Sequence, residues 1–123
     1  MIVGIGVDLT PVDRMARAMS RYQGRFEARV FTDDERAYCN AKADKFQHFA
    51  ARFAAKEAIL KALMVPEGLS WHELEIVNDD EGAPRISLSG QAERAAEKLG
   101  VRKLHLSLTH AGGQAMAFVI AEG

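Results

Sequence analysis

The chain has 123 residues, a length normally found for one folded domain with a substantial hydrophobic core. Its net charge is −1 and no apolar run approaches the length of a membrane span, so nucleic-acid-binding and membrane-spanning classes are not indicated. The single cysteine, Cys39, excludes an internal disulfide and the N-terminus lacks a signal-peptide pattern, so we expect one cytoplasmic domain covering residues 1–123.

The first predicted element is an apolar, β-branched strand at residues 2–9 that contains Gly4 and Gly6. Glycines inside a strand indicate that another backbone comes close to it. The strand ends in Asp8, an acid without an obvious structural partner, which makes it a candidate site residue. Thr10 stands directly before a proline, and proline suits the first position of a helix. We therefore expect Thr10 to be the N-cap of the next helix.

Residues 11–22 have the spacing of an amphipathic helix, with an apolar stripe formed by Met15, Ala18, Met19 and Tyr22. A second stripe has no acid between its members and consists of Arg14, Arg17, Arg21 and, if the helix passes Gly24, Arg25. Such a stripe is usually a solvated face. Arginine is also the residue suited to carboxylate and phosphate recognition, so a binding surface is the second interpretation.

A capping box at Thr32 and Glu35 predicts the start of a short helix that extends to about Ala43. Tyr38 and Cys39 are expected to pack inward. No helix N-terminus or neighbouring histidine is available to activate the thiol, so Cys39 is not expected to be a nucleophile.

The longest predicted helix covers residues 46–64, which are rich in alanine and contain no glycine or proline. This apolar helix carries four charged residues in two pairs, each with a spacing of four positions. The pairs are Arg52 with Lys56 and Glu57 with Lys61. Burying charge is costly unless the charge is paired or binds a ligand. Structural ion pairs and a ligand site are therefore the two interpretations. The helix is expected to end at the segment 65–68.

The second half of the chain is richer in strands. A turn at residues 79–82 predicts a hairpin, and a small helix with Leu99 facing inward precedes two further strands. The predicted ranges are 74–78 and 84–89 for the hairpin, 90–99 for the helix, and 103–109 and 114–121 for the last strands. The order indicates an α+β domain, with a mainly antiparallel sheet of about five short strands packed on the long central helix.

His110 differs from the other histidines because it stands at a strand end before a glycine-rich turn, where site residues often gather. The sequence has no zinc-ligand spacing, no phosphate-binding GxxxxGK[ST] loop and no complete dinucleotide fingerprint. A zinc enzyme, a P-loop nucleotidase and a Rossmann domain are therefore not indicated.

Three motifs occur in order at residues 4–9 (GIGVDL), 53–63 (FAAKEA followed by KAL) and 107–110 (SLTH). Together they resemble the holo-acyl-carrier-protein synthases, the small trimeric type of 4′-phosphopantetheinyl transferase. The resemblance covers essentially the whole chain. It departs from the family pattern at Met64, where the family commonly has glycine soon after the KAL segment, and this concerns the path of the loop that covers the substrate.

The resemblance implies a 4′-phosphopantetheinyl transferase fold and transfer of the 4′-phosphopantetheine arm of coenzyme A to a serine of apo acyl-carrier protein. Adenosine 3′,5′-bisphosphate is the other product, and the reaction serves fatty acid biosynthesis. Asp8 and Glu57 would bind Mg²⁺, which prefers one or two carboxylates together with phosphate and water. Catalysis would rest on Glu57, Lys61 and Asp8, with Glu57 as the first candidate for the general base. The coenzyme A contacts would be Arg52, Lys56, Lys61, His110 and Pro84.

The resemblance also implies a homotrimer with clefts between subunits. Apolar residues on both faces of the last predicted strand support this, because one helical layer covers only one face of a sheet. Acyl-carrier proteins are strongly acidic, so docking to a chain of net charge −1 needs a local basic surface. The expected surface is the arginine stripe of Arg14, Arg17, Arg21 and Arg25.

Two other functional classes are compatible with these motifs. The first is a catalytically inactive module that binds carrier proteins, and the presence of Asp8, Glu57 and Lys61 argues against it. The second is a generic Mg²⁺-dependent phosphohydrolase, which would act on simple phosphate esters without a protein acceptor.

Overall fold

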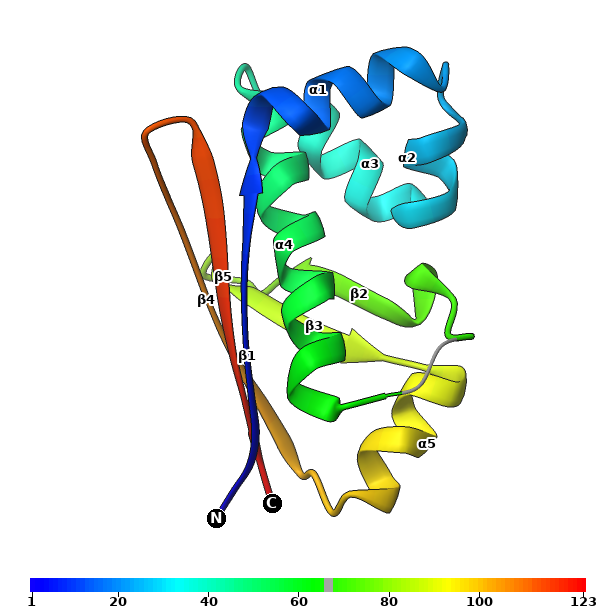
Figure 1. Cartoon of the computed structure of the whole chain (residues 1–123), viewed down its shortest axis with the longest axis vertical. Coiled ribbons are helices and arrows are strands. Elements are labelled where there is room, and N and C mark those ends of the chain that lie inside the picture. The colour runs from blue at the N-terminus through cyan, green and yellow to red at the C-terminus, as the bar shows by residue number, and fades with distance from the viewer. Residues whose placement is uncertain (66–67) are drawn as a thin grey trace.

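The structure is a computed structural model and describes residues 1–65 and 68–123. In chain order the elements are β1 (Ile2–Pro11), α1 (Val12–Arg21), α2 (Arg25–Val30), α3 (Asp33–Asn40), α4 (Lys45–Leu63), the 3₁₀ turn η1 (Trp71–Glu73), β2 (Leu74–Asn78), β3 (Pro84–Leu88), α5 (Gly90–Lys98), β4 (Lys103–Ala111) and β5 (Gln114–Glu122). Figure 1 shows α4 in the middle, between the three long strands on one side and the remaining helices and the β2–β3 hairpin on the other. None of the described helices is long and apolar enough to span a membrane.

The strands form two antiparallel sheets. The larger sheet has the order β1-β5-β4, and the smaller one consists of β2 and β3. The α+β class, the antiparallel pairing and the long central helix are confirmed. The expectation of one sheet of about five short strands is wrong, because β3 and β4 do not pair and the strands of the larger sheet have nine or ten residues.

The glycines of β1 allow α4 to lie directly against the sheet. A Cβ atom at Gly4 would overlap the carbonyl oxygen of Ala62, and one at Gly6 would overlap that of Ala58. The close backbone approach expected from the sequence is therefore confirmed. It fixes the distance between β1 and α4, and both elements carry charged side chains beyond this contact.

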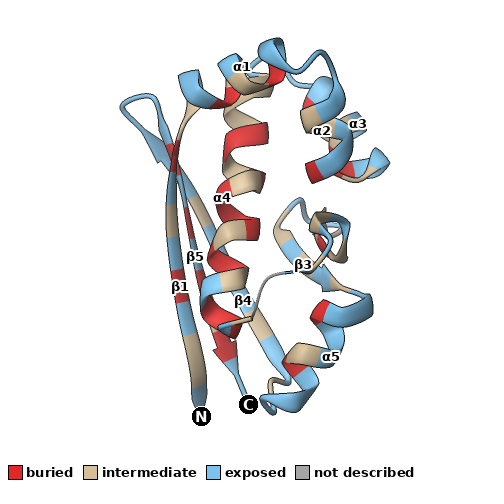
Figure 2. Ribbon diagram, turned by 45° about the vertical axis from the view of Figure 1, so that its right-hand side comes forward, coloured by how far each residue is buried: buried red, intermediate tan, exposed pale blue. Residues whose placement is uncertain are grey.

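The hydrophobic core has two parts, and both use α4. The alanines Ala54, Ala55 and Ala58 pack with the inward side chains of β5 in one part. Phe31 and Phe49, with ring centroids 5.0 Å apart, belong to the other part under α1 to α3. Figure 2 shows that buried residues follow α4 over most of its length. The helix therefore acts as the common support for both halves of the molecule.

Local signals predicted α3 well and α1 less well. Thr32 and Glu35 form the expected capping box at the start of α3. At α1, however, β1 continues through Pro11 and no side chain caps the helix, so the expectation of a Thr10 cap is wrong. Two residues expected to face inward, Tyr22 and Leu99, are exposed instead. They lie at the C-terminal ends of their helices, beyond the surface that the core covers.

The helix α4 ends close to the predicted position. Its C-cap is Met64, which has a left-handed backbone conformation with φ 50°. The predicted stop segment 65–68 lies partly outside the described residues.

The outer face of the larger sheet is apolar and exposed. Side chains alternate along β5, so that Ala115, Ala117, Val119 and Ala121 are buried while Met116 and Phe118 point outward. Their neighbours on β1 are also outward and exposed, with Leu9 opposite Met116 and Val7 opposite Phe118. In Figure 2 none of the described helices lies over this face of the strands. The sequence-based expectation of apolar residues on both faces of the strand is confirmed.

Candidate functional site

The first group of candidate residues lies where β1 passes α4. Lys61 extends from α4 and its Nζ donates hydrogen bonds to the carbonyl oxygen of Val7 at 2.9 Å and to Asp8 Oδ1 at 3.2 Å. The Lys61 side chain is 54% exposed and that of Asp8 is 19% exposed. The pair is therefore accessible to a ligand from one side, although its members are 53 positions apart in the sequence.

Glu57 belongs to the same group. Partial burial raises the pKa of its carboxyl group and the nearby negative charge of Asp8 raises it further, whereas Lys61 and Arg14 lower it. These effects show that two carboxylates, a lysine and an arginine share one electrostatic environment. Such an environment favours a cation between the carboxylates or a phosphate beside the two basic groups.

The four charged residues of α4 do not pair with one another as expected from their spacing. Lys61 pairs with Asp8, while Lys56 pairs with Glu35 of α3 at 2.8 Å and donates to the carbonyl oxygen of Trp71 at 2.9 Å. The side chains of Lys56 and Glu35 are both 0% exposed. The expectation that Lys56 contacts phosphate is therefore corrected, because its buried ammonium group is already used within the fold.

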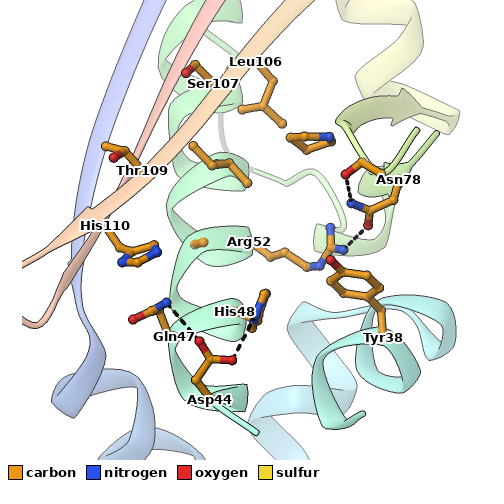
Figure 3. A pocket seen from close by; sticks show the side chains of 14 residues that line it. Tyr38, Asp44, Gln47, His48, Arg52, Asn78, Leu106, Ser107, Thr109 and His110 are labelled. Carbon is orange, nitrogen blue, oxygen red and sulfur yellow. Dashed lines mark hydrogen bonds and ion pairs between the residues drawn. The ribbon is translucent and has the colours of Figure 1, made fainter. Parts of the chain in front are cut away.

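The second group of candidates lines a cavity of about 440 Å³ between α4, α3, the β2–β3 hairpin and β4. Three of the residues expected to bind coenzyme A meet there, namely Arg52, Pro84 and His110. Figure 3 shows Arg52 extending from α4 toward Asn78 and Tyr38, with His110 on the opposite side of the cavity. The structure thus brings together residues from three separate segments of the sequence.

Arg52 is held firmly in this cavity. Its guanidinium donates to the Ile76 carbonyl oxygen at 3.1 Å and to Asn78 Oδ1 at 2.6 Å, and it lies 4.3 Å from the ring centre of Tyr38. The Nε atom has no hydrogen-bond partner among the described residues. The Nε atom is itself buried, so what Arg52 offers an anionic ligand in the cavity is the positive potential of its guanidinium group.

The two groups of candidates lie at opposite edges of the larger sheet. Asp8 is on β1 and His110 is on β4, and β5 separates these two strands. One chain therefore does not assemble all of its expected coenzyme A contacts into a single site.

The arginine stripe is present on α1. Arg14, Arg17 and Arg21 line one shallow surface depression together with Tyr22. Arg25 does not continue the stripe, because α1 ends at Arg21 and Gly24, with φ 89°, turns the chain into α2. The expected basic surface therefore consists of three arginines, and it begins beside Glu57, whose pKa Arg14 lowers.

Three residues that contribute to these groups were not among the candidates expected from the sequence. Tyr38 and Asn78 contact Arg52, and their partnership with it depends on contacts between distant segments. Thr10 donates a hydrogen bond from Oγ1 to Asp8 Oδ2 at 3.2 Å. Its position two residues after Asp8 on the same strand face was a signal that could have revealed it.

The thiol of Cys39 lies beside Arg52, whose charge and hydrogen bond lower the pKa of the thiol, but burial has the larger effect. Cys39 is buried, and burial raises its pKa to about 11. The thiol therefore stays protonated at neutral pH, in agreement with the expectation that it is not a nucleophile.

The carboxylates fit a magnesium ion better than a zinc ion. Among residues 1–65 and 68–123 no three His, Cys, Asp or Glu side chains are grouped as metal ligands. Mg²⁺, however, is commonly bound by one or two carboxylates and completed by substrate phosphates and water. Asp8 and Glu57 supply that number of carboxylates, and Lys61 beside them can contact phosphate oxygens.

Residues 4–119 match the family model of the 4′-phosphopantetheinyl transferase superfamily named ACPS. The chain is 49% identical to a holo-[acyl-carrier-protein] synthase of Anaeromyxobacter dehalogenans (strain 2CP-C), covering 100% of this chain and 98% of the relative. It is 48% identical to the protein of the same name from Solibacter usitatus, over 99% of both chains.

Two solved structures of this kind are also similar. The holo-[acyl-carrier-protein] synthase of Neisseria meningitidis aligns over 100% of both chains with a TM-score of 0.91 and 29% identity. That of Helicobacter pylori, solved in complex with coenzyme A, aligns over 96% of this chain and 99% of the other, with a TM-score of 0.83 and 31% identity.

Proposed function

Because this chain belongs to the holo-[acyl-carrier-protein] synthase family of the 4′-phosphopantetheinyl transferase superfamily, we propose that it transfers 4′-phosphopantetheine from coenzyme A to a serine of apo acyl-carrier protein. The observation that carries the proposal is the meeting of Asp8, Glu57 and Lys61 in one accessible group at the contact of β1 with α4. The coenzyme A complex of the Helicobacter pylori relative supports the choice of substrate. A cytoplasmic location is part of the proposal.

The reaction forms one bond and breaks one bond at phosphorus. The serine oxygen attacks the phosphorus that carries the pantetheine arm, and the bond from that phosphorus to the bridging oxygen of the pyrophosphate breaks. Adenosine 3′,5′-bisphosphate leaves with the electron pair. The serine proton passes to Glu57, directly or through a water molecule, and the raised pKa of Glu57 suits this role.

The remaining charged groups neutralise the phosphates. Mg²⁺ held by Asp8 and Glu57 would supply charge neutralisation on the pyrophosphate oxygens. Lys61 is 54% exposed and lies beside Asp8, so its ammonium can contact a phosphate oxygen without being drawn out of a buried position. Phosphoryl transfer depends mainly on such positioning and charge neutralisation.

The proposal includes assembly into a homotrimer with one cleft between each pair of subunits. Support comes from two features that a single chain leaves unexplained. The outer sheet face exposes large apolar side chains, among them Val7, Leu9 and Phe118. In addition, the Asp8 group and the Arg52 cavity lie at opposite sheet edges, so a second copy is needed to place one beside the other.

Sedimentation and mixing experiments test this assembly. Wild-type protein should sediment as a trimer, and Phe118→Asp should give an inactive monomer, because the charge would lie on the apolar face. Asp8→Asn chains mixed with His110→Ala chains should recover activity, since some clefts then receive two undamaged halves. A fully active wild-type monomer would contradict the shared cleft.

The decisive test of the activity is mass spectrometry of an apo acyl-carrier protein after incubation with coenzyme A, Mg²⁺ and this protein. The expected result is a mass gain of one phosphopantetheine group, lost on addition of a chelator and absent with Glu57→Gln. Hydrolysis of simple phosphate esters without the acceptor would instead favour the phosphohydrolase. Binding of the carrier without any mass change would favour the inactive module.

A further inference from the structure

Both oxygens of the Asp8 carboxylate are held, each from a different direction. Lys61 donates to Oδ1 and Thr10 donates from its hydroxyl to Oδ2, each at 3.2 Å. The Lys61 side chain is 54% exposed and reaches in from α4, whereas Thr10 is only 4% exposed. We propose that Thr10 is a positioning residue, whose hydroxyl holds Asp8 in the orientation that phosphopantetheine transfer requires. The inference rests on the proposed function and adds a residue to it.

The placement of Thr10 makes its hydroxyl a fixed donor. Thr10 and Asp8 are two residues apart on β1, so their side chains lie on the same face of the strand, toward α4. Opposite Thr10 in the sheet is Ala115, which is fully buried and small. A β-branched side chain has few χ1 choices in a strand, and burial restricts them further. The hydroxyl therefore approaches Oδ2 from a constant direction.

The hydroxyl has no competing duty in the adjacent helix. Thr10 stands where an N-cap is expected, but α1 has no side-chain cap. The first helical N–H, that of Val12, instead donates to the carbonyl oxygen of Gly113 at 2.9 Å. A threonine whose local sequence suits a cap is thus turned toward Asp8. Departures from local preference of this kind are expected at functional sites.

Loss of the hydroxyl should change how Asp8 receives a ligand. With Oδ2 no longer held, the carboxylate can rotate about its χ angles and pair more fully with Lys61. Binding of Mg²⁺ and coenzyme A would then have to break that pair and reorder the carboxylate. Partners that orient a metal-binding side chain commonly change metal affinity by roughly 10- to 100-fold when they are removed.

The test compares Thr10→Val, which removes the hydroxyl at nearly constant volume, with Thr10→Ser, which keeps it. Calorimetric titration of coenzyme A at a series of Mg²⁺ concentrations gives the half-saturating Mg²⁺ concentration for each protein. We expect an increase of roughly tenfold for Thr10→Val and values within about twofold of wild type for Thr10→Ser. Turnover at limiting Mg²⁺ should fall in parallel, and saturating Mg²⁺ should restore much of it.

Thr32→Val is the matched control, because it also removes a partly buried threonine hydroxyl, one that caps α3 and donates to Glu75. It should lower the melting temperature without changing the half-saturating Mg²⁺ concentration. Thr10→Ala replaces Thr10→Val if the valine variant folds poorly.

The inference is overturned if the Thr10→Val protein binds coenzyme A with wild-type Mg²⁺ dependence, or if Thr10→Ser is impaired as strongly as Thr10→Val. It is also overturned if Thr32→Val shifts the Mg²⁺ dependence equally, since the effect would then follow stability alone. Failure of the proposed function is a separate result, namely a wild-type protein that transfers no phosphopantetheine.

Discussion

Two lysines on α4, five positions apart, form ion pairs of opposite character. Lys56 pairs with Glu35, and neither side chain is exposed to solvent. Lys61 pairs with Asp8, and both side chains are accessible. Five residues correspond to about 140° around a helix, so the two lysines leave α4 in different directions. One points into the helical half of the molecule and the other toward the edge of β1.

The buried pair belongs to a network that fixes α4. Glu35 accepts hydrogen bonds from the backbone N–H groups of Thr32 and Ile76, while Lys56 also donates to Trp71. The network therefore ties α4 to α3, η1 and β2. The accessible pair links α4 to β1, but exposed ion pairs contribute little stability. One helix therefore directs its buried charge and its accessible charge to different sides of the molecule.

The largest effect is expected at the accessible group. Glu57→Gln should lower the rate of transfer by about 10²- to 10⁴-fold, because it removes the proposed base and one metal ligand. Its thermal stability should be unchanged or raised. The pKa of Glu57 is raised in the folded protein, so ionised Glu57 is disfavoured there at neutral pH, and a neutral side chain removes that cost.

Asp8→Asn should reduce activity in the same way and serves as the companion variant, measured with mass spectrometry of the carrier and with thermal melts. Full activity of either protein at saturating coenzyme A and limiting Mg²⁺ would remove it from the proposed site.

Lys56→Met tests the contribution of the buried Lys56–Glu35 pair to stability. The substitution leaves Glu35 buried without its counter-ion, which should lower the free energy of unfolding by about 3–5 kcal/mol in urea titrations. Lys61→Met should lower it by less than about 1 kcal/mol but should strongly impair transfer. Adding Glu35→Gln to Lys56→Met should regain part of the lost stability. Equal stability losses for the two lysine variants would contradict the structural difference between the buried pair and the accessible pair.

Gly6→Ala tests whether the accessible group depends on the close contact of β1 with α4. The added Cβ would overlap the Ala58 carbonyl oxygen, so the strand must move away from the helix. We expect a loss of about 1–3 kcal/mol in the free energy of unfolding, together with reduced transfer because Asp8 moves away from Lys61. Gly112→Ala is the control, since nothing lies within 4 Å of its added Cβ and only its positive φ causes strain. A stable and fully active Gly6→Ala protein would rule out this dependence.

The smallest effect is expected at the arginine stripe. Arg17→Glu and Arg21→Glu should each raise the KM for the carrier protein by about fivefold and leave coenzyme A binding nearly unchanged, since rim charges mainly govern encounter. Added salt should weaken the wild-type reaction in the same direction. Arg94→Glu, on the exposed side of α5, should change neither value. Weakened coenzyme A binding with an unchanged carrier KM would assign the stripe to the nucleotide instead.

The sequence alone determined the features that depend on neighbours a few positions away. The length of α4 follows from its uninterrupted helix formers, and the α3 cap follows from Thr32 and Glu35. The glycines of β1 predicted that another backbone lies close to this strand. The motifs around Asp8 and Glu57 indicated the family, and with it the type of reaction. These signals are local, because propensity, capping and strand alternation act within one or two turns of the chain.

Only the tertiary structure decided which partner each charged group has. Spacing suggested that the charges of α4 pair along the helix, yet Lys56 pairs with Glu35 of α3 and Lys61 with Asp8 of β1. The hydroxyl of Thr10 was expected to cap α1 and instead contacts Asp8. Each choice depends on which element packs nearby and excludes water, and that is set by contacts far apart in the sequence, as the 53 positions between Asp8 and Lys61 illustrate.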